Sequence, residues 1–134
     1  VAGQGEEVAY PDAQGTTITD AQTKSENETV EVSLGRPFAV TRYNPETDST
    51  INVDCELVAT VLIEEQDEFN TQFASNENRL REQVIFTLQS AEANDLNDPG
   101  LGLIKRQILE KTNRALGRPL VREVLVTRFN YVER

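Results

Sequence analysis

The sequence predicts an α+β domain in which a three- to four-stranded sheet carries two amphipathic helices on one face, in the order β-β-α-α-β. Three observations predict this fold class. Apolar residues occupy every second position from 51 to 63, which is the period of a half-buried strand. Residues 69–88 and 101–116 carry apolar side chains at three- and four-residue spacing, which is the period of a helix face. Residues 120–132 are again rich in Val, Leu, Phe and Tyr, which favour strands.

The composition divides the 134 residues into an acidic linker and one domain. Residues 1–29 hold six acidic residues and one lysine among many Gly, Gln, Thr and Asn. Such a segment buries too little apolar surface to offset the entropy of ordering, so it is predicted to be a flexible linker. Residues 30–134 remain as a domain that is long enough for one hydrophobic core.

The first strand is predicted to be broken and to lie at a sheet edge. Residues 30–42 follow an extended pattern in two parts, which Gly35 and Pro37 separate. Proline cannot donate a hydrogen bond within a central ladder, which places this stretch at an edge. The turn signal at residues 44–48 then predicts an antiparallel hairpin with residues 51–63.

The first helix is predicted to be regular from 76 to 91. Phe69 and Phe73 carry the same apolar spacing, but Asn76 is a residue that begins helices. We therefore expect the two phenylalanines to lie on a preceding turn.

The second helix is predicted to follow a connection at residues 93–100. Asp98 before Pro99 is typical of a helix N-cap, and Gly117 of a C-cap. The strand at 120–132 follows a helical crossover, so parallel pairing with an earlier strand is the expected arrangement.

Charge and hydropathy exclude several function classes. The net charge is -10 and no basic stripe is present, whereas nucleic-acid binding needs phosphate neutralisation. The same charge opposes docking on anionic lipid through the folded surface. No apolar run approaches the roughly 18 residues of a membrane span. The lone Cys55 lies on the apolar face of the long strand and is predicted to be a small buried hydrophobe.

Catalytic and metal-binding patterns are sparse. The chain has no histidine, which removes the commonest general base and zinc ligand, and it has no glycine-rich phosphate loop. Asp54 and Glu56 share the polar face of the long strand, as a solvated face or as the carboxylate pair of a hydrolase. The acidic stretches at 64–68 and 95–98 lack the ligand spacing of a calcium loop. We therefore expect no enzyme, no metal and no cofactor.

The basic residues gather in the second half of the chain. Those proposed as partner contacts are Arg79, Arg81, Arg118, Arg122 and Arg128. The second helix adds Lys105, Arg106, Lys111 and Arg114. Two interpretations remain open: a solvated helix face, and a surface for an acidic partner or a neighbouring copy of the domain.

Several short motifs between residues 30 and 132 carry a family resemblance. They are Pro37-Phe38-Ala39-Val40, Arg81-Glu82-Gln83-Val84-Ile85, Leu88-Gln89-Ser90, Asp95-Leu96, Gly102-Leu103-Ile104-Lys105, Ile108-Leu109, Asn113, Val121-Arg122-Glu123-Val124 and Phe129. Together with the long alternating strand, they resemble the periplasmic, stomatin-like domain of the flagellar basal-body-associated FliL family.

The resemblance implies a non-enzymatic structural or interaction domain that supports the flagellar motor stator or a comparable membrane complex. It implies a protein anchored to the inner membrane by a helix upstream of Val1, with this domain on the periplasmic side. It also implies protein partners, including self-association into rings, with no contact to nucleic acid. The alternative is a small soluble module that binds a ligand or peptide on the polar sheet face or at an unpaired strand edge.

Overall fold

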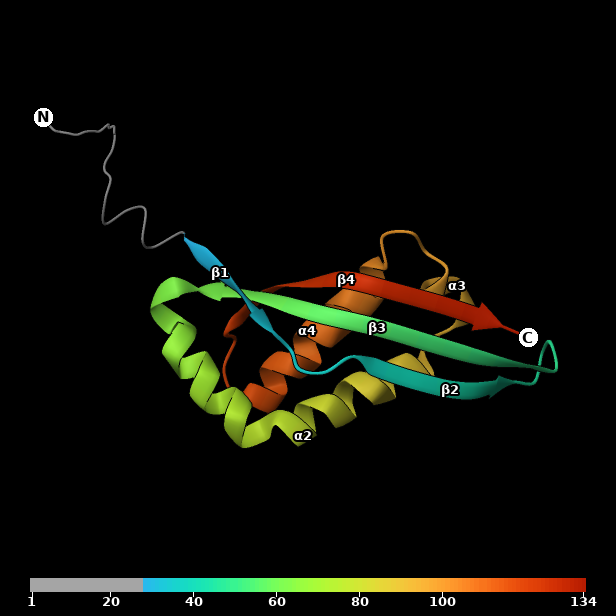
Figure 1. Ribbon diagram of the computed structural model, residues 1–134, viewed down its shortest axis with the longest axis horizontal. Helices are drawn as coiled ribbons and strands as arrows, with labels where there is room; N and C mark the ends of the chain where they lie inside the picture. Colours follow the sequence, from blue (N-terminus) through green and yellow to red (C-terminus); the bar gives the residue numbers. More distant parts are fainter. Residues whose placement is uncertain (1–27) are drawn as a thin grey trace, which may run out of the picture. The chain divides into compact units, whose positions relative to one another are not determined.

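The computed structural model describes residues 28–134 as strands and helices in an α+β arrangement (Figure 1). In chain order the elements are β1 (Thr29–Ser33), β2 (Phe38–Asn44), β3 (Ser49–Leu62), η2 (Ile63–Glu65), α2 (Gln66–Ser90), α3 (Ala93–Leu96), α4 (Gly102–Leu116) and β4 (Val121–Glu133). The predicted linker at 1–29 lies outside the described residues up to residue 27.

The described residues divide into two units. The first contains residues 28–30 and Leu62–Asp67, and within it the backbone N–H of Ile63 donates to the carbonyl oxygen of Glu28 at 3.2 Å. The second unit is Glu31–Val61 with Glu68–Arg134, and it holds the sites considered below.

Strand β3 is the centre of a four-stranded antiparallel sheet, because β1, β2 and β4 all pair with it. β2 and β4 both pair with residues 51–55 of β3, so they lie on its opposite edges. The predicted hairpin is confirmed, with Val40 opposite Val53 in β2 and β3. The predicted break is also confirmed, because the ladder is interrupted between β1 and β2 and Gly35 takes a φ of 105°.

The last strand is antiparallel to β3, so the expected parallel pairing is wrong. A single helix after β3 would return the chain to the start of that strand. Here α2 makes that return and α4 runs back again, so β4 begins beside the end of β3, with Val121 opposite Val61. The presence of two helices therefore sets the direction of the final strand.

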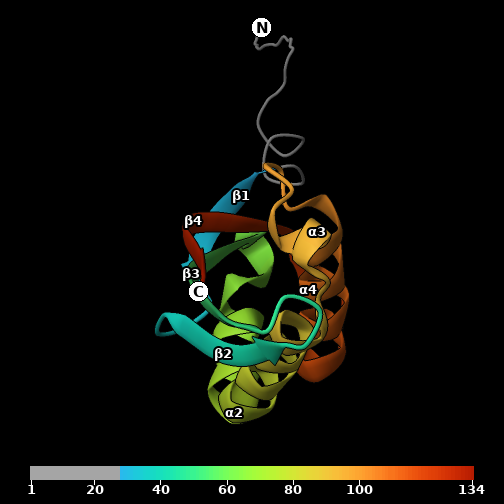
Figure 2. The ribbon, with the colours of Figure 1, turned by 90° about the vertical axis from the view of Figure 1, so that its right-hand side faces the viewer.

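One face of the sheet is dry, and both long helices cover it (Figures 1 and 2). Every second residue of β3 from Ile51 to Val61 is buried. The helices contribute Leu80, Val84 and Leu88 from α2, and Ile104, Ile108 and Leu116 from α4. The predicted α+β class with helices on one face is confirmed; the observed order differs in the split first strand and in the two short helical segments η2 and α3.

Helix α2 starts earlier than predicted and is broken where Asn76 stands. It begins at Gln66, so Phe69 and Phe73 are helical rather than on a turn. Asn76 has non-helical angles (φ -127°, ψ 18°), and its side-chain amide donates to the carbonyl oxygen of Gln72 at 2.9 Å. A side chain inserted into the backbone ladder is a recognised cause of a helix kink.

Helix α4 begins later than the predicted cap. Leu101 stands before its first turn with a left-handed backbone (φ 51°, ψ 36°), so Asp98 is not the N-cap. The Asp98 carboxylate instead accepts a hydrogen bond from the N–H of Gly102 at 3.1 Å. The C-cap is confirmed, because Gly117 has φ 85° and its N–H donates to the carbonyl oxygens of Asn113 and Arg114.

Candidate functional site

The single thiol lies in the core. Cys55 is 2% exposed, and burial, aided by the negative charge of Asp54, raises the pKa of its thiol to about 11. A thiol with so high a pKa stays protonated near neutral pH and is a poor nucleophile. The prediction of a small buried hydrophobe at this position is confirmed.

Residues 28–134 contain no group of three or more Cys, Asp or Glu side chains placed to hold a metal ion. Within the same residues, no helix is long and apolar enough to cross a bilayer.

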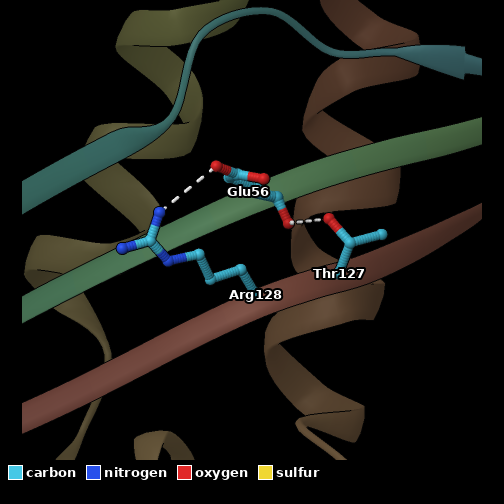
Figure 3. A network of polar contacts seen from close by, with 3 residues as sticks. All are labelled: Glu56, Thr127 and Arg128. Atoms are coloured by element: carbon cyan, nitrogen blue, oxygen red, sulfur yellow. Dashed lines mark hydrogen bonds and ion pairs between the residues drawn. The ribbon is translucent and has the colours of Figure 1, made fainter.

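Asp54 and Glu56 both lie on the open face of the sheet, and the Glu56 carboxylate forms an ion pair with a cation. A guanidinium nitrogen of Arg128 lies 3.5 Å from the Glu56 carboxylate, across the β3–β4 pair (Figure 3). Both side chains are exposed, so the pair contributes little to stability. Asp54 stands opposite Asn130, two pairs further along the same ladder. This geometry is that of a solvated sheet face with a cross-strand ion pair.

A β-bulge shapes this part of the sheet. The register between β3 and β4 shifts after Glu56, so that Arg128 faces Glu56 while Val126 faces Leu57. The hydroxyl of the intervening Thr127 donates to the backbone carbonyl oxygen of Glu56 at 3.4 Å (Figure 3). The bulge turns Arg128 to the open face, because one extra residue reverses the alternation of side chains.

Arg81 is used inside the domain. Its guanidinium donates to the carbonyl oxygens of Arg36 at 2.8 Å and Pro37 at 3.0 Å, and it lies 4.2 Å from the centre of the Phe38 ring. Burial, together with the neighbouring charge of Arg36, lowers the pKa of Arg81. Arg81 therefore connects α2 to the segment between β1 and β2 through hydrogen bonds to its backbone.

The other predicted arginines lie on separate surfaces. Arg118 forms an ion pair with Glu68 and so links the α4–β4 connection to α2. Arg122 is exposed near the start of β4, and Arg79 is exposed on α2. Since Arg128 lies on the open sheet face, opposite the helix layer that carries Arg79, the five arginines do not form one site.

A polar cluster that sequence reasoning missed surrounds Glu133. Its carboxylate accepts hydrogen bonds from the Asn44 amide at 3.1 Å and from the hydroxyls of Thr47 at 2.6 Å, Ser49 at 2.5 Å and Tyr131 at 3.1 Å. Hydrogen bonds from Ser49 and then Thr47 are the main reasons that the pKa of Glu133 falls to about 2. We call these five residues the Glu133 cluster. It ties the end of β4 to the β2–β3 turn.

The open face of the sheet also exposes apolar surface. Tyr43 on β2 is 60% exposed and Val132 on β4 is 40% exposed. Val132 stands opposite Asn52, whose amide oxygen accepts a hydrogen bond from the Thr41 hydroxyl at 2.8 Å. Exposed aromatic and polar side chains on an open sheet face suit contact with another protein better than enclosure of a small molecule.

Comparison with known protein families identifies a family that spans most of the chain. A family model described as "Flagellar basal body-associated protein FliL" matches residues 31–131, which is most of the chain. No curated protein matches the chain.

Proposed function

This chain belongs to the flagellar basal body-associated FliL family, and on that premise we propose that it is a non-enzymatic structural domain that supports the flagellar motor stator or a comparable membrane complex. The family match is the observation that carries the proposal, since it runs from within β1 to within β4 and includes both long helices.

The chemistry of the described residues supports a structural role. The thiol is buried with a raised pKa, and the carboxylate of Glu56 is held beside Arg128. The side chains that stand out on the surface are instead exposed aromatic and cationic groups, such as Tyr43, Phe86 and Arg79. Such groups are enriched where proteins contact one another.

The proposed place of action is the periplasmic side of the inner membrane, with anchoring by a helix upstream of Val1. This part of the proposal rests on the family membership. Reading the gene upstream of Val1 tests it, because an anchor needs about 20 apolar residues with Lys or Arg on the cytoplasmic side. A fusion of the protein to alkaline phosphatase, which is active only outside the cytoplasm, tests the location. A fusion that is inactive in the periplasmic assay would overturn the proposed place.

Deletion of the gene in the source organism tests the role itself. We expect swimming speed in viscous medium to fall, because a less supported stator delivers less torque, and we expect the wild-type gene to restore it. Unchanged swimming together with an unchanged number of stators per motor, counted by a fluorescent stator subunit, would contradict the proposal.

A further inference from the structure

A small recess lies between the two long helices, α2 and α4. It has a volume of about 120 Å³ and is lined by Arg79 and Gln83 from α2 and by Lys111, Arg114 and Ala115 from α4. Figures 1 and 2 show these two helices side by side under the sheet. The lining residues recur at three- and four-residue spacing, which places them on one face of each helix.

The recess concentrates positive charge in a protein whose net charge is -10. Three of its five lining residues are cations and none is acidic. Among residues 28–134, no carboxylate lies within salt-bridge distance of Arg79, Lys111 or Arg114. None of these three cations therefore forms an ion pair with a carboxylate of the described part of the domain, whereas Arg118 and Arg128 each have a carboxylate partner.

An exposed aromatic ring borders the recess. Phe86, one turn after Gln83 on α2, is 56% exposed. The Lys111 ammonium lies 4.8 Å from the centre of the Phe86 ring, a cation–π contact that holds the cation at the edge of the recess. Leu103, eight residues before Lys111 on α4, is 36% exposed. Cations beside exposed apolar side chains match a ligand that carries carboxylates beside apolar groups.

We propose that the recess and its border form a docking site for an acidic segment of a protein partner. One Asp or Glu side chain of the partner enters between Arg79, Lys111 and Arg114, and a neighbouring apolar side chain packs on Phe86. This inference rests on the proposed structural role and specifies the chemistry of the partner. Charge complementarity favours this occupant, because each carboxylate gains partners that the described domain does not supply.

The observations favour a protein segment over a membrane surface. Residues 30–134 carry a net charge of -5, from 12 basic and 17 acidic residues, which repels anionic lipid. Three cations in a recess between two helices also differ from the broad basic surface that lipid headgroups need. A carboxylate on a helix or an extended segment reaches a recess of this size.

Fluorescence anisotropy with the full chain tests the proposal. The probe is a short labelled helical peptide with a stripe of glutamates beside a stripe of leucines, and its control carries glutamine at every glutamate. We expect the acidic peptide to bind and its affinity to fall as salt is raised. We expect Lys111→Ala with Arg114→Ala to weaken binding by about tenfold or more, and Phe86→Ser to weaken it by a smaller factor.

Lys105→Ala with Arg106→Ala is the matched control. It removes the same two charges from α4, but neither residue lines the recess. We expect this control to change affinity by less than about twofold, and we expect the melting temperatures of all variants to stay close to that of the wild type, since the substituted side chains are not core residues.

Several results would overturn the inference. The glutamine peptide could bind as tightly as the acidic peptide, or the Lys105/Arg106 control could weaken binding as much as the Lys111/Arg114 variant. Inorganic phosphate alone could saturate the recess, or phosphatidylserine vesicles could bind more strongly than the peptide. The chain could also show a monomer–oligomer equilibrium that the Lys111/Arg114 variant abolishes. Each assigns the recess to another occupant or to none. The deletion phenotype is measured separately, so a failed peptide assay with an intact swimming defect refutes only this inference.

Discussion

The Glu133 cluster and the recess between α2 and α4 differ in whether their charged side chains have partners within the domain. In the cluster a single carboxylate receives four hydrogen bonds from side chains of the same domain. In the recess three cations face a hollow with no carboxylate partner among residues 28–134. The contrast separates polar groups that hold the fold from those that remain available to a partner. Arg81 and Arg79 show the same contrast two residues apart on one helix.

The largest expected effect comes from Arg81→Ala, which removes the contacts that the Arg81 guanidinium makes within the domain. Two backbone carbonyl oxygens lose their donors and Phe38 loses its cover, so we expect a loss of about 1–3 kcal/mol in unfolding free energy. Denaturant unfolding followed by circular dichroism measures it. The control is Arg79→Ala, which we expect to change stability by less than about 0.5 kcal/mol. Equal losses in the two variants would remove the distinction between them.

Arg81→Lys sharpens the same comparison. Lysine keeps the charge but cannot present two donors in a fixed fork to the carbonyl oxygens of Arg36 and Pro37. We expect this variant to be less stable than the wild type and more stable than Arg81→Ala in the same unfolding assay. If Arg81→Lys were as stable as the wild type, the positive charge alone, without the paired hydrogen bonds, would be enough to hold the segment between β1 and β2 against α2.

Glu133→Gln is expected to have a smaller effect. The substitution replaces one acceptor oxygen with a donor amide that faces the hydroxyls of Thr47 and Ser49. We expect a lower melting temperature in differential scanning calorimetry, by less than in Arg81→Ala because the cluster is exposed. Glu46→Gln, in the same turn but outside the cluster, serves as the control. A melting temperature equal to that of the wild type would show that water molecules replace the hydrogen bonds of the cluster without loss of stability.

The Glu133 cluster also predicts an acid-sensitive contribution to stability. The pKa of Glu133 is about 2 in the folded protein, below its ordinary value of 4.5, so the folded state favours the ionised form. Its contribution is complete above about pH 4.5 and is lost as the pH falls towards 2. We expect the difference in melting temperature between wild type and Glu133→Gln to shrink across this interval. A constant difference would contradict the role of ionisation.

The smallest expected effect belongs to the exposed pair between Glu56 and Arg128. Glu56→Gln removes one charge at a distance of 3.5 Å from its partner, and exposed pairs contribute about 0.2–1 kcal/mol or nothing measurable. We expect a change near the lower end of that range in urea unfolding, and less at high salt. A change as large as that of Arg81→Ala would indicate that the bulge at Thr127 depends on the pair.

The sequence predicts this fold well where one period dominates. Alternation from Ile51 to Val61 identifies β3 and its buried face, and the helical spacing of Leu80, Val84 and Leu88 identifies the buried side of α2. The apolar spacing does not predict whether the last strand is parallel or antiparallel to β3. That direction depends on how many helices the chain forms between the two strands. Local cap signals also fail where a side chain such as Asp98 bonds further along the chain than the motif implies.

For the candidate sites, the sequence indicates which types of residue are present but not which other residues they contact. Arginine composition pointed to partner contacts, but Arg81 meets carbonyl oxygens of residues 36 and 37, more than forty positions away. The Glu133 cluster joins residues 44–49 to residue 133 through the register of three strands, which no short motif encodes. The recess required the facing sides of two helices to be known together.

The break at Asn76 bears on how the native protein fluctuates. It divides α2 into two hydrogen-bonded segments, since the Asn76 side chain occupies the Gln72 carbonyl oxygen in the middle of the helix. Such a break lets one segment open without the other, so the two should exchange their amide hydrogens at different rates. The recess residues Arg79 and Gln83 both follow the break, on the segment that carries the core residues Leu80, Val84 and Leu88. The α2 side of the recess would thus persist through openings of the first half of that helix.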